Sequence, residues 1–275
     1  MRSDGRANDQ LRPIKVTRSF TSAPAGSVLW QQGQTIVLAT ASIVRELPPW
    51  MRESEPGGWV TGNYVMLPGS TPQRKGWPKI GHTDSRGTEI ERLIGRSLRA
   101  VVDLTRIGPH TITVDCQVLQ ADGGTRTAAV CAGFVALRDA IARLQASWRE
   151  VPGLVMPRGN NQFNFGDDVN PPNAEVPARF DASRYDPGGA IVEQLAAVSV
   201  GVVDGEPLLD LHYDDDHRAT VDMNVAATAA GRLVEVQASA ENGPHGFDAG
   251  MLGRLTALAV AGCGRIHQVI DGLSD

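Results

Sequence analysis

The chain has 275 residues and a formal net charge of −5 at neutral pH, from 26 basic and 31 acidic side chains. Its content of 41% hydrophobic and 21% charged residues is typical of a globular protein and excludes fibrous and wholly disordered classes. The acidic balance also argues against a general nucleic-acid coat protein, which is usually basic.

The charge is divided unevenly along the chain. Residues 1–150 hold 19 basic and 13 acidic side chains, a net charge of +6, whereas residues 151–275 hold 7 and 18, a net charge of −11. Only three of the 26 basic residues are lysines. A G+C-rich genome accounts for this bias, and arginine also suits bidentate contacts with phosphate, so composition does not decide between the two readings.

Short strands are predicted at the start of the chain. Residues 27–44 hold two β-rich runs around a glycine-containing turn, which predicts a hairpin, and residues 57–67 form a third run. Residues 68–87 are rich in proline, glycine and basic side chains and predict a long loop. Loops of that length are uncommon in compact domains unless they are functional or disordered.

A first amphipathic helix is predicted over residues 88–104, with Asp84 or Ser85 able to cap its start. Apolar residues recur there at helical spacing: Ile90, Leu93, Ile94, Leu98, Val101 and Val102. Arg86 lies near the positive end of this helix, where its charge is unfavourable. A bound anion that Arg86 helps to hold would explain its position.

Three further arginines, Arg92, Arg96 and Arg99, lie three and four residues apart and therefore share a face of this helix. Together with Arg74 in the preceding loop, they are candidates for RNA contact. The commoner alternative for such a row is a solvated face whose arginines pair with nearby acids.

A strand, a glycine loop and a second helix are predicted next. Residues 110–120 alternate and are β-branched, which predicts a strand. Residues 128–144 are apolar nearly all round, which predicts a buried helix. Between them lies the sequence Asp-Gly-Gly-Thr-Arg-Thr, residues 122–127.

The second half begins with residues 151–190, which lack periodicity and predict a loop insertion, with a domain boundary as the second choice. Residues 191–213 predict two strands joined at Asp204-Gly205, and residues 214–239 predict an acidic cluster and two strands around Gly231. Residues 247–273 predict a closing amphipathic helix.

The glycine loop is a candidate anion site. Gly123 and Gly124 allow backbone N–H groups to converge just before a helix N-terminus, an arrangement that binds phosphate-like anions. Thr125 adds a hydroxyl, and Arg126 adds a planar fork for two phosphate oxygens. The spacing is not that of a common P-loop. A tight turn with Asp122 or Thr125 as the helix cap is an equally good interpretation of the loop alone.

A second candidate site lies in the acidic cluster. Asp216 and Asp222 are hard oxygen donors of the kind that Mg²⁺ accepts together with substrate phosphates. An acid within an apolar strand needs a partner, which makes Asp222 the stronger candidate. A solvated acidic turn is favoured for Asp214 and Asp215. The glycine loop of residues 122–127, as a site that holds an anion (an anion cradle), and this carboxylate pair together suit metal-assisted phosphoryl transfer.

The sequence lacks the motifs of zinc-binding, secreted and membrane-spanning proteins. The three cysteines form no CxxC pair and no HExxH motif is present, so we expect buried thiols and no structural zinc site. The N-terminus carries charge from its second residue, which argues against a signal peptide. No segment approaches the length of a membrane span. We therefore expect a cytoplasmic protein with no membrane partner.

Six blocks of the sequence resemble successive signature blocks of the ribonuclease PH family, in that family's order. They are MRSDGRANDQLRP, TDSRGTEIERLIGRSLRAVVDL, TITVDCQVLQADGGTRTAAV, LAAVSVGVVDGEPLLDLHY, TVDMNV and GRLVEVQ, and they span residues 1 to about 240. The loop after residue 67 departs from the family pattern: it keeps Arg74 but has Gly69 and Trp77 where the family commonly carries arginine.

The resemblance implies an α/β fold (of α+β type) with mixed β-sheets packed against helices, in one compact ribonuclease PH-type domain over residues 1–275. It implies a phosphorolytic 3′→5′ exoribonuclease, a tRNA nucleotidyltransferase that trims the 3′ ends of tRNA precursors and other RNA and releases nucleoside diphosphates. It also implies a homo-oligomer, a hexamer built as a trimer of dimers.

By the same resemblance, Arg86, Gly124, Thr125 and Arg126 hold the attacking inorganic phosphate. Asp216 and Asp222 are similar to the acidic pair that holds Mg²⁺ and assists departure of the 3′ oxygen. Two alternatives are a non-catalytic RNA-binding subunit of a related ring and a metal-dependent hydrolase on the same scaffold. Retention of these residues favours the enzyme over an inactive subunit.

Overall fold

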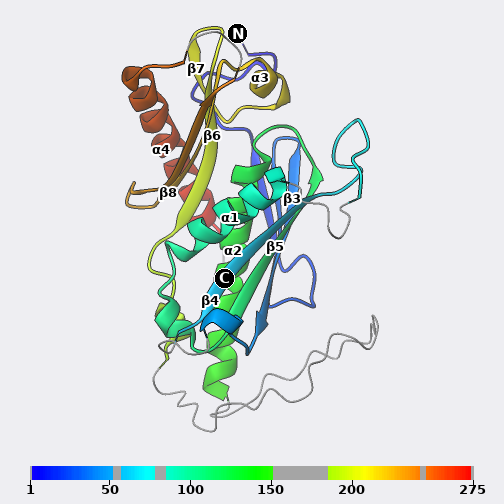
Figure 1. The fold of residues 1–275 in the computed structure, drawn as a ribbon, viewed down its shortest axis with the longest axis vertical. Helices are drawn as coiled ribbons and strands as arrows, with labels where there is room; N and C mark the ends of the chain where they lie inside the picture. The colour runs from blue at the N-terminus through cyan, green and yellow to red at the C-terminus, as the bar shows by residue number, and fades with distance from the viewer. Residues whose placement is uncertain (1, 52–56, 78–84, 151–184, 242–245, 274–275) are drawn as a thin grey trace.

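Two β-sheets with a long buried helix between them form the frame of the protein (Figure 1). The structure is a computed structural model that describes residues 2–51, 57–77, 85–150, 185–241 and 246–273. The strands are β1 (Ile14–Arg18), β2 (Gly26–Gln32), β3 (Thr35–Val44), β4 (Trp59–Met66), β5 (Thr111–Gln120), β6 (Leu195–Val203), β7 (Glu206–Leu209), β8 (Val221–Thr228) and β9 (Leu233–Ala240). The helices are α1 (Ser85–Arg99), α2 (Thr125–Glu150), α3 (Tyr213–Arg218) and α4 (Ala249–Asp271), with short 3₁₀ turns η1 (Pro49–Met51), η2 (Leu104–Ile107) and η4 (Pro187–Gly189).

The first sheet has the strand order β1-β2-β3-β5-β4. Its pairs are antiparallel except β4 with β5, which is parallel and needs a crossover that α1 supplies. Alternate residues of β5 are buried, so one face of the sheet carries the apolar side chains. Helices α1 and α2 contact each other and cover that face.

The second sheet is antiparallel, with the order β7-β6-β8-β9. Every residue of β6 is buried, because α2 packs on one face of the sheet and α4 on the other (Figure 1). The thiol of Cys131 on α2 donates to the carbonyl of Ala197 at 3.3 Å, and that of Cys263 on α4 to the carbonyl of Ala196 at 3.6 Å. The helix predicted to be apolar all round is therefore the one that lies between two sheets.

These layers confirm the predicted α/β class with mixed sheets packed against helices. One continuous cluster of buried apolar side chains includes residues of both sheets and of α1, α2 and α4. The three cysteines are free and buried, as expected, and burial raises the pKa of Cys263 to about 12. In the described part of the chain, no helix is long and apolar enough to cross a membrane.

Helix α1 differs from its predicted bounds at both ends. It begins at Ser85, so Ser85 is its first residue rather than its cap, and Asp84 lies outside the described residues. It ends at Arg99 instead of residue 104, because the chain turns there and Val102 forms a β-bridge with Ile191. The prediction failed at this end because the bridging partner lies far along the sequence.

The other predicted elements are found, with small shifts of their ends. The hairpins around Gly33, Asp204-Gly205 and Gly231 are all present, and α2 starts three residues before its predicted start. The sequence pattern did not single out β1 or the short helix α3. Residues 68–77 of the predicted loop contain turns only, and residues 151–184 of the predicted insertion lie outside the described residues.

Close packing of β2 on α2 makes Gly26 a sensitive position. A Cβ atom there would lie 1.9 Å from the carbonyl oxygen of Ala136, which is backbone and cannot move aside. We expect Gly26→Ala to lower the free energy of unfolding by about 3 kcal/mol. Gly253 of α4 has open space around its Cβ position, so Gly253→Ala should instead stabilise the protein, by about 0.5–1 kcal/mol. Chemical denaturation of both variants checks this; equal midpoints would contradict it.

Candidate active site

A cavity of about 790 Å³ lies where the first half of the chain meets the second. Its lining comes from the loop after β4, the first turns of α1 and α2, α3 and the start of β8. It includes all six residues predicted to bind phosphate or metal and one of the four predicted to contact RNA: Arg86, Gly124, Thr125, Arg126, Asp216, Asp222 and Arg74.

The cations and acids of this lining come from different parts of the chain. All four basic side chains belong to the first half: Arg74, Lys75, Arg86 and Arg126. Three of the four acids, Asp216, Asp222 and Glu241, belong to the second half. The uneven charge seen in the sequence thus recurs in the cavity, where basic side chains from the first half and acids from the second half share one lining.

The glycine loop needs the conformational freedom of both its glycines. Gly123 and Gly124 both lie in the left-handed region, with φ of 72° and 61°. A Cβ atom on Gly123 would lie 2.5 Å from the carbonyl oxygen of Leu211, so this position also needs glycine for space. The carbonyl of Gly124 accepts from the N–H of Ala128 at 3.0 Å and so begins α2.

The two candidate cap residues make other bonds. The carboxylate of Asp122 accepts from the backbone N–H of Tyr213 at 3.1 Å, which ties the loop to the start of α3. The hydroxyl of Thr125 accepts from the phenol of Tyr64 at 2.9 Å. Burial raises the pKa of Tyr64, so this phenol stays a donor at neutral pH. These bonds connect the loop and the start of α2 to α3 and to β4.

Two arginines lie in the first turns of two different helices that meet at the cavity. Arg86 is the second residue of α1 and Arg126 is the second residue of α2. A cation there opposes the helix dipole, so both positions are locally unfavourable. Arg86 is exposed, whereas Arg126 is half-buried and donates to the side chain of Gln237 at 3.3 Å. Neither helix has an acid in its first turn to offset the charge.

The acidic pair is built from α3 and β8. The chain does not run straight from Asp216 into a strand; it first completes the short helix α3 and then enters β8 at Val221. Burial raises the pKa of both Asp216 and Asp222, and for Asp222 the value reaches about 6. The charge of Asp216 adds to the shift of Asp222, so the two carboxylates are close enough to repel each other.

The arginine row of α1 has other contacts. Arg99 donates to the carbonyl of Val60 at 2.9 Å and lies 4.3 Å from the centre of the Trp59 ring. Arg96 pairs with Glu235 of β9 at 3.0 Å, and Arg92 is exposed. Of the four arginines predicted to contact RNA, Arg74 alone is in the lining of the cavity as the described residues define it.

Sequence reasoning missed several lining residues. Tyr213 is 60% exposed and Asn224 donates to the carboxylate of Asp222 at 3.2 Å. Tyr213 directly precedes the acidic cluster, and Asn224 shares a face of β8 with Asp222, since the two are two residues apart. Those spacings were signals that could have found them.

Comparison with known proteins decides the family. Residues 10–142 match the model of the 3′ exoribonuclease family, domain 1, and residues 193–249 match that of domain 2. A ribonuclease PH of Nocardia farcinica is 44% identical over 269 residues, which cover 98% of this chain and 90% of the relative. The chain belongs to the 3′ exoribonuclease family. A ribonuclease PH of Rhodopirellula baltica, 42% identical over 96% of this chain and 94% of its own length, agrees.

Two solved structures share the fold. Rice Rrp46 matches with a TM-score of 0.68 at 19% identity, covering 98% of this chain and 99% of its own. A chain of the Archaeoglobus fulgidus exosome, solved with RNA bound to the active site, matches with a TM-score of 0.69 at 18% identity, covering 98% and 92%. The predicted resemblance to the ribonuclease PH family and the predicted fold are thereby confirmed.

Proposed function

We propose that this family member is a phosphorolytic 3′→5′ exoribonuclease that trims the 3′ ends of tRNA precursors, with inorganic phosphate as co-substrate. The observation that carries the proposal is the cavity itself. It brings two arginines from helix N-termini, a glycine loop and two half-buried carboxylates to one place. Relatives named ribonuclease PH that cover nearly the whole chain support the same activity.

The reaction joins two anions that repel each other, and the basic side chains of the cavity reduce that repulsion. An oxygen of inorganic phosphate attacks the phosphorus of the last internucleotide bond. The bond to the 3′ oxygen of the preceding nucleotide breaks, and the last nucleotide leaves as a nucleoside diphosphate. Arg86 and Arg126 offset the charge of the attacking phosphate, and Gly124 and Thr125 offer it donors. Positioning and charge neutralisation supply most of the catalysis in such transfers.

Asp216 and Asp222 would hold Mg²⁺. Among the described residues, no group of three or more histidine, cysteine or acidic side chains could hold a metal alone. Mg²⁺ needs fewer protein ligands, because it binds through one or two carboxylates together with water and substrate phosphates. The raised pKa values of this pair also fit a cation, whose charge would relieve their mutual repulsion. When bound, the ion would neutralise charge that develops on the departing 3′ oxygen.

We assign contact with RNA to exposed residues of the cavity lining. Arg74 and Lys75 offer charge to the RNA backbone, and the exposed ring of Tyr213 offers a surface on which a base can stack. Arg96 and Arg99 have protein partners already, so we assign them a smaller part. Arg92, exposed on the same helix, remains a candidate for RNA outside the cavity.

Two other functions compete with this proposal. A non-catalytic ring subunit fits the likeness to exosome chains, but that likeness concerns the fold alone and the cavity keeps both acids and both arginines. A metal-dependent hydrolase would use water in place of phosphate at the same acids. The anion cradle favours phosphate, since water needs no such cradle.

One assay separates the three functions. The protein is incubated with a 3′-extended tRNA and Mg²⁺, with and without inorganic phosphate, and the released mononucleotides are identified. We expect nucleoside diphosphates that form only when phosphate is present. Nucleoside monophosphates without phosphate would indicate hydrolysis, and the absence of product in both reactions would indicate a binding subunit.

Three further expectations belong to this proposal. The continuous core through both sheets supports one structural unit over the two family domains. A hexamer, built as a trimer of dimers, is a prediction that sedimentation velocity would test. A cytoplasmic location is likewise a prediction, to be tested by cell fractionation.

A further inference from the structure

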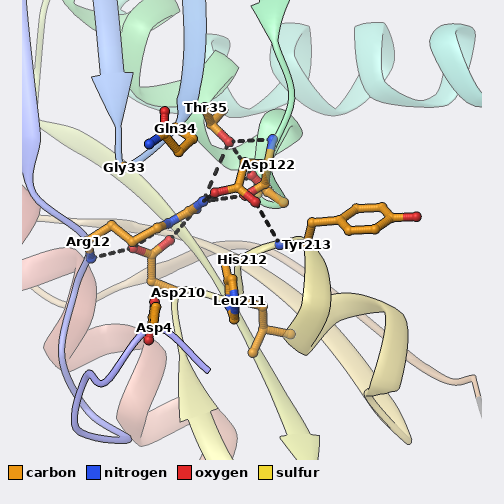
Figure 2. Close-up of polar contacts among 12 residues, drawn as sticks. Asp4, Arg12, Gly33, Gln34, Thr35, Asp122, Asp210, Leu211, His212 and Tyr213 are labelled. Atoms are coloured by element: carbon orange, nitrogen blue, oxygen red, sulfur yellow. Dashed lines mark hydrogen bonds and ion pairs between the residues drawn. The ribbon is translucent and has the colours of Figure 1, made fainter. Parts of the chain in front are cut away.

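A buried ion pair lies directly behind the glycine loop, between Arg12 and Asp210 (Figure 2). Arg12 is 5% exposed and Asp210 1% exposed. The guanidinium donates through Nε to Oδ2 at 3.1 Å and through Nη2 to Oδ1 at 2.7 Å. The backbone N–H of Arg12 adds a third bond, to Oδ2 at 2.7 Å. The carboxylate is thereby clamped on both oxygens.

Asp210 is held in this position at some cost. Its φ is 54°, in the left-handed region that residues other than glycine seldom adopt. Such backbone persists where the surroundings determine it, and here its N–H donates to the carbonyl of Ser199 at 2.7 Å. Burial would raise the pKa of Asp210, but the charge and hydrogen bonds of Arg12 outweigh burial and hold that pKa below its usual value. The Asp210 carboxylate is therefore ionised at neutral pH.

The other N–H groups of Arg12 reach the glycine loop. Nη1 donates to the carbonyl of Asp122, and Nη2 lies 3.5 Å from the carbonyl oxygen of Gly123. Thr35 of β3 completes the arrangement: its hydroxyl donates to the carbonyl of Gly123 at 2.7 Å and accepts from the N–H of Asp122 at 3.0 Å. Figure 2 shows Arg12 reaching from the N-terminal segment to Asp122, with Thr35 beside it.

Anchored carbonyls fix where the loop's N–H groups point. In a planar trans peptide the C=O and the following N–H point in opposite directions, and the described residues contain no cis bond. With the carbonyls of Asp122 and Gly123 turned toward Arg12 and Thr35, the N–H groups of Gly123 and Gly124 point away from them. Arg12 thus sets the direction of the donors that an anion in front of the loop would meet.

We propose that Arg12 is a positioning residue for the attacking phosphate, because it holds the two carbonyls whose peptide units present N–H donors to that phosphate. This inference rests on the proposed phosphate site. It gives the buried ion pair a functional role. Stability alone seldom explains such a pair, since replacing it with apolar side chains is often neutral. The same loop also contacts α3, the helix that carries Asp216, through the bond from Tyr213 to Asp122.

The test compares lysine substitutions at two bidentate arginines. Arg12→Lys keeps one charge beside Asp210 but cannot bond to both carboxylate oxygens and both carbonyls. Arg18→Lys changes the Arg18 pair with Asp139, which has bonds of 3.0 and 2.9 Å on another part of α2. We expect Arg12→Lys to raise the KM for phosphate about tenfold, with kcat within about threefold and Arg18→Lys unchanged in both.

A second variant and a second measurement cover the case in which Arg12→Lys does not fold. Thr35→Val removes the hydroxyl that bridges Asp122 and Gly123 while keeping the shape of the side chain, and we expect about a threefold rise in the phosphate KM. Thermal unfolding with increasing inorganic phosphate measures binding without turnover. Arg12→Lys should need about tenfold more phosphate for the same rise in Tm.

Arg126→Ala, which should raise the phosphate KM strongly, separates failure of this inference from failure of the proposed function. If Arg126→Ala raises that KM but Arg12→Lys and Thr35→Val behave like Arg18→Lys, Arg12 is structural only and the inference is overturned. If Arg126→Ala leaves phosphate binding unchanged, the phosphate site itself is misplaced and both proposals fall. A rise in the RNA KM alone in Arg12→Lys would also overturn the inference.

Discussion

Arg126→Ala is expected to raise the apparent KM for phosphate about 10- to 100-fold, because it removes charge-assisted hydrogen bonds each worth about 1.5–3 kcal/mol. The kcat at saturating phosphate should fall much less. The fold should stay intact, since Arg126 is half-buried and its hydrogen bond to a side chain, to Gln237, is long at 3.3 Å. Removing a cation from the first turn of α2 also relieves an unfavourable interaction with the helix dipole.

Steady-state phosphorolysis across a range of phosphate concentrations measures this effect. Arg143→Ala is the matched control, because Arg143 lies exposed on the same helix and donates to the carbonyl of Pro24. Arg126→Lys should recover part of the affinity, since it restores the charge without the fork. An unchanged phosphate KM in Arg126→Ala would remove Arg126 from the phosphate site.

The elements that local pattern determines were predicted well. The alternation of residues 111–120 and the uniformly apolar run that follows are properties of single segments, and both became the elements expected. The C-terminus of α1 was not predictable in this way. Val101 and Val102 continue the helical spacing, but Val102 pairs with Ile191 instead, and the partner is invisible to a local window. Tertiary pairing overrode periodicity there.

The site shows the same division. Gly123, Gly124 and Asp222 carried local signals, a double glycine before a helix and an acid within an apolar strand. The ion pair between Arg12 and Asp210, which supports the glycine loop, carried no local signal, because the two residues lie 198 positions apart. The N-terminal arginines appeared in the sequence only as part of a family block. The structure gives them a physical reason: Arg2 and Arg6 donate to the carbonyl of Asp210 at 2.9 and 3.0 Å.

The second large effect is expected at Asp222. Asp222→Asn should reduce phosphorolysis by about 10³-fold, because an amide is a poor ligand for the Mg²⁺ that would neutralise charge at the departing oxygen. Mg²⁺ should raise the Tm of the unchanged protein and have little effect on the variant, which tests the metal site without turnover. Asp214→Asn is the control, because Asp214 is exposed in the same acidic cluster and does not line the cavity.

Without divalent cations, the same substitution should stabilise the protein. Burial and the charge of Asp216 raise the pKa of Asp222 to about 6 in the folded state, above the value of about 3.9 for an unfolded chain. The folded state therefore binds this proton more tightly. Ionisation destabilises it progressively as the pH rises from about 4 through 6, and the cost is complete above that range.

At pH 8 in the presence of a chelator, Asp222→Asn should thus increase the free energy of unfolding by about 1–3 kcal/mol, and at pH 4 the gain should vanish. Denaturation curves at the two pH values measure it, with Asp214→Asn unchanged at both. This result would show that the Asp222 carboxylate lowers the stability of the fold and that its position is explained by function. A variant that loses activity and stability together would instead make Asp222 a structural acid.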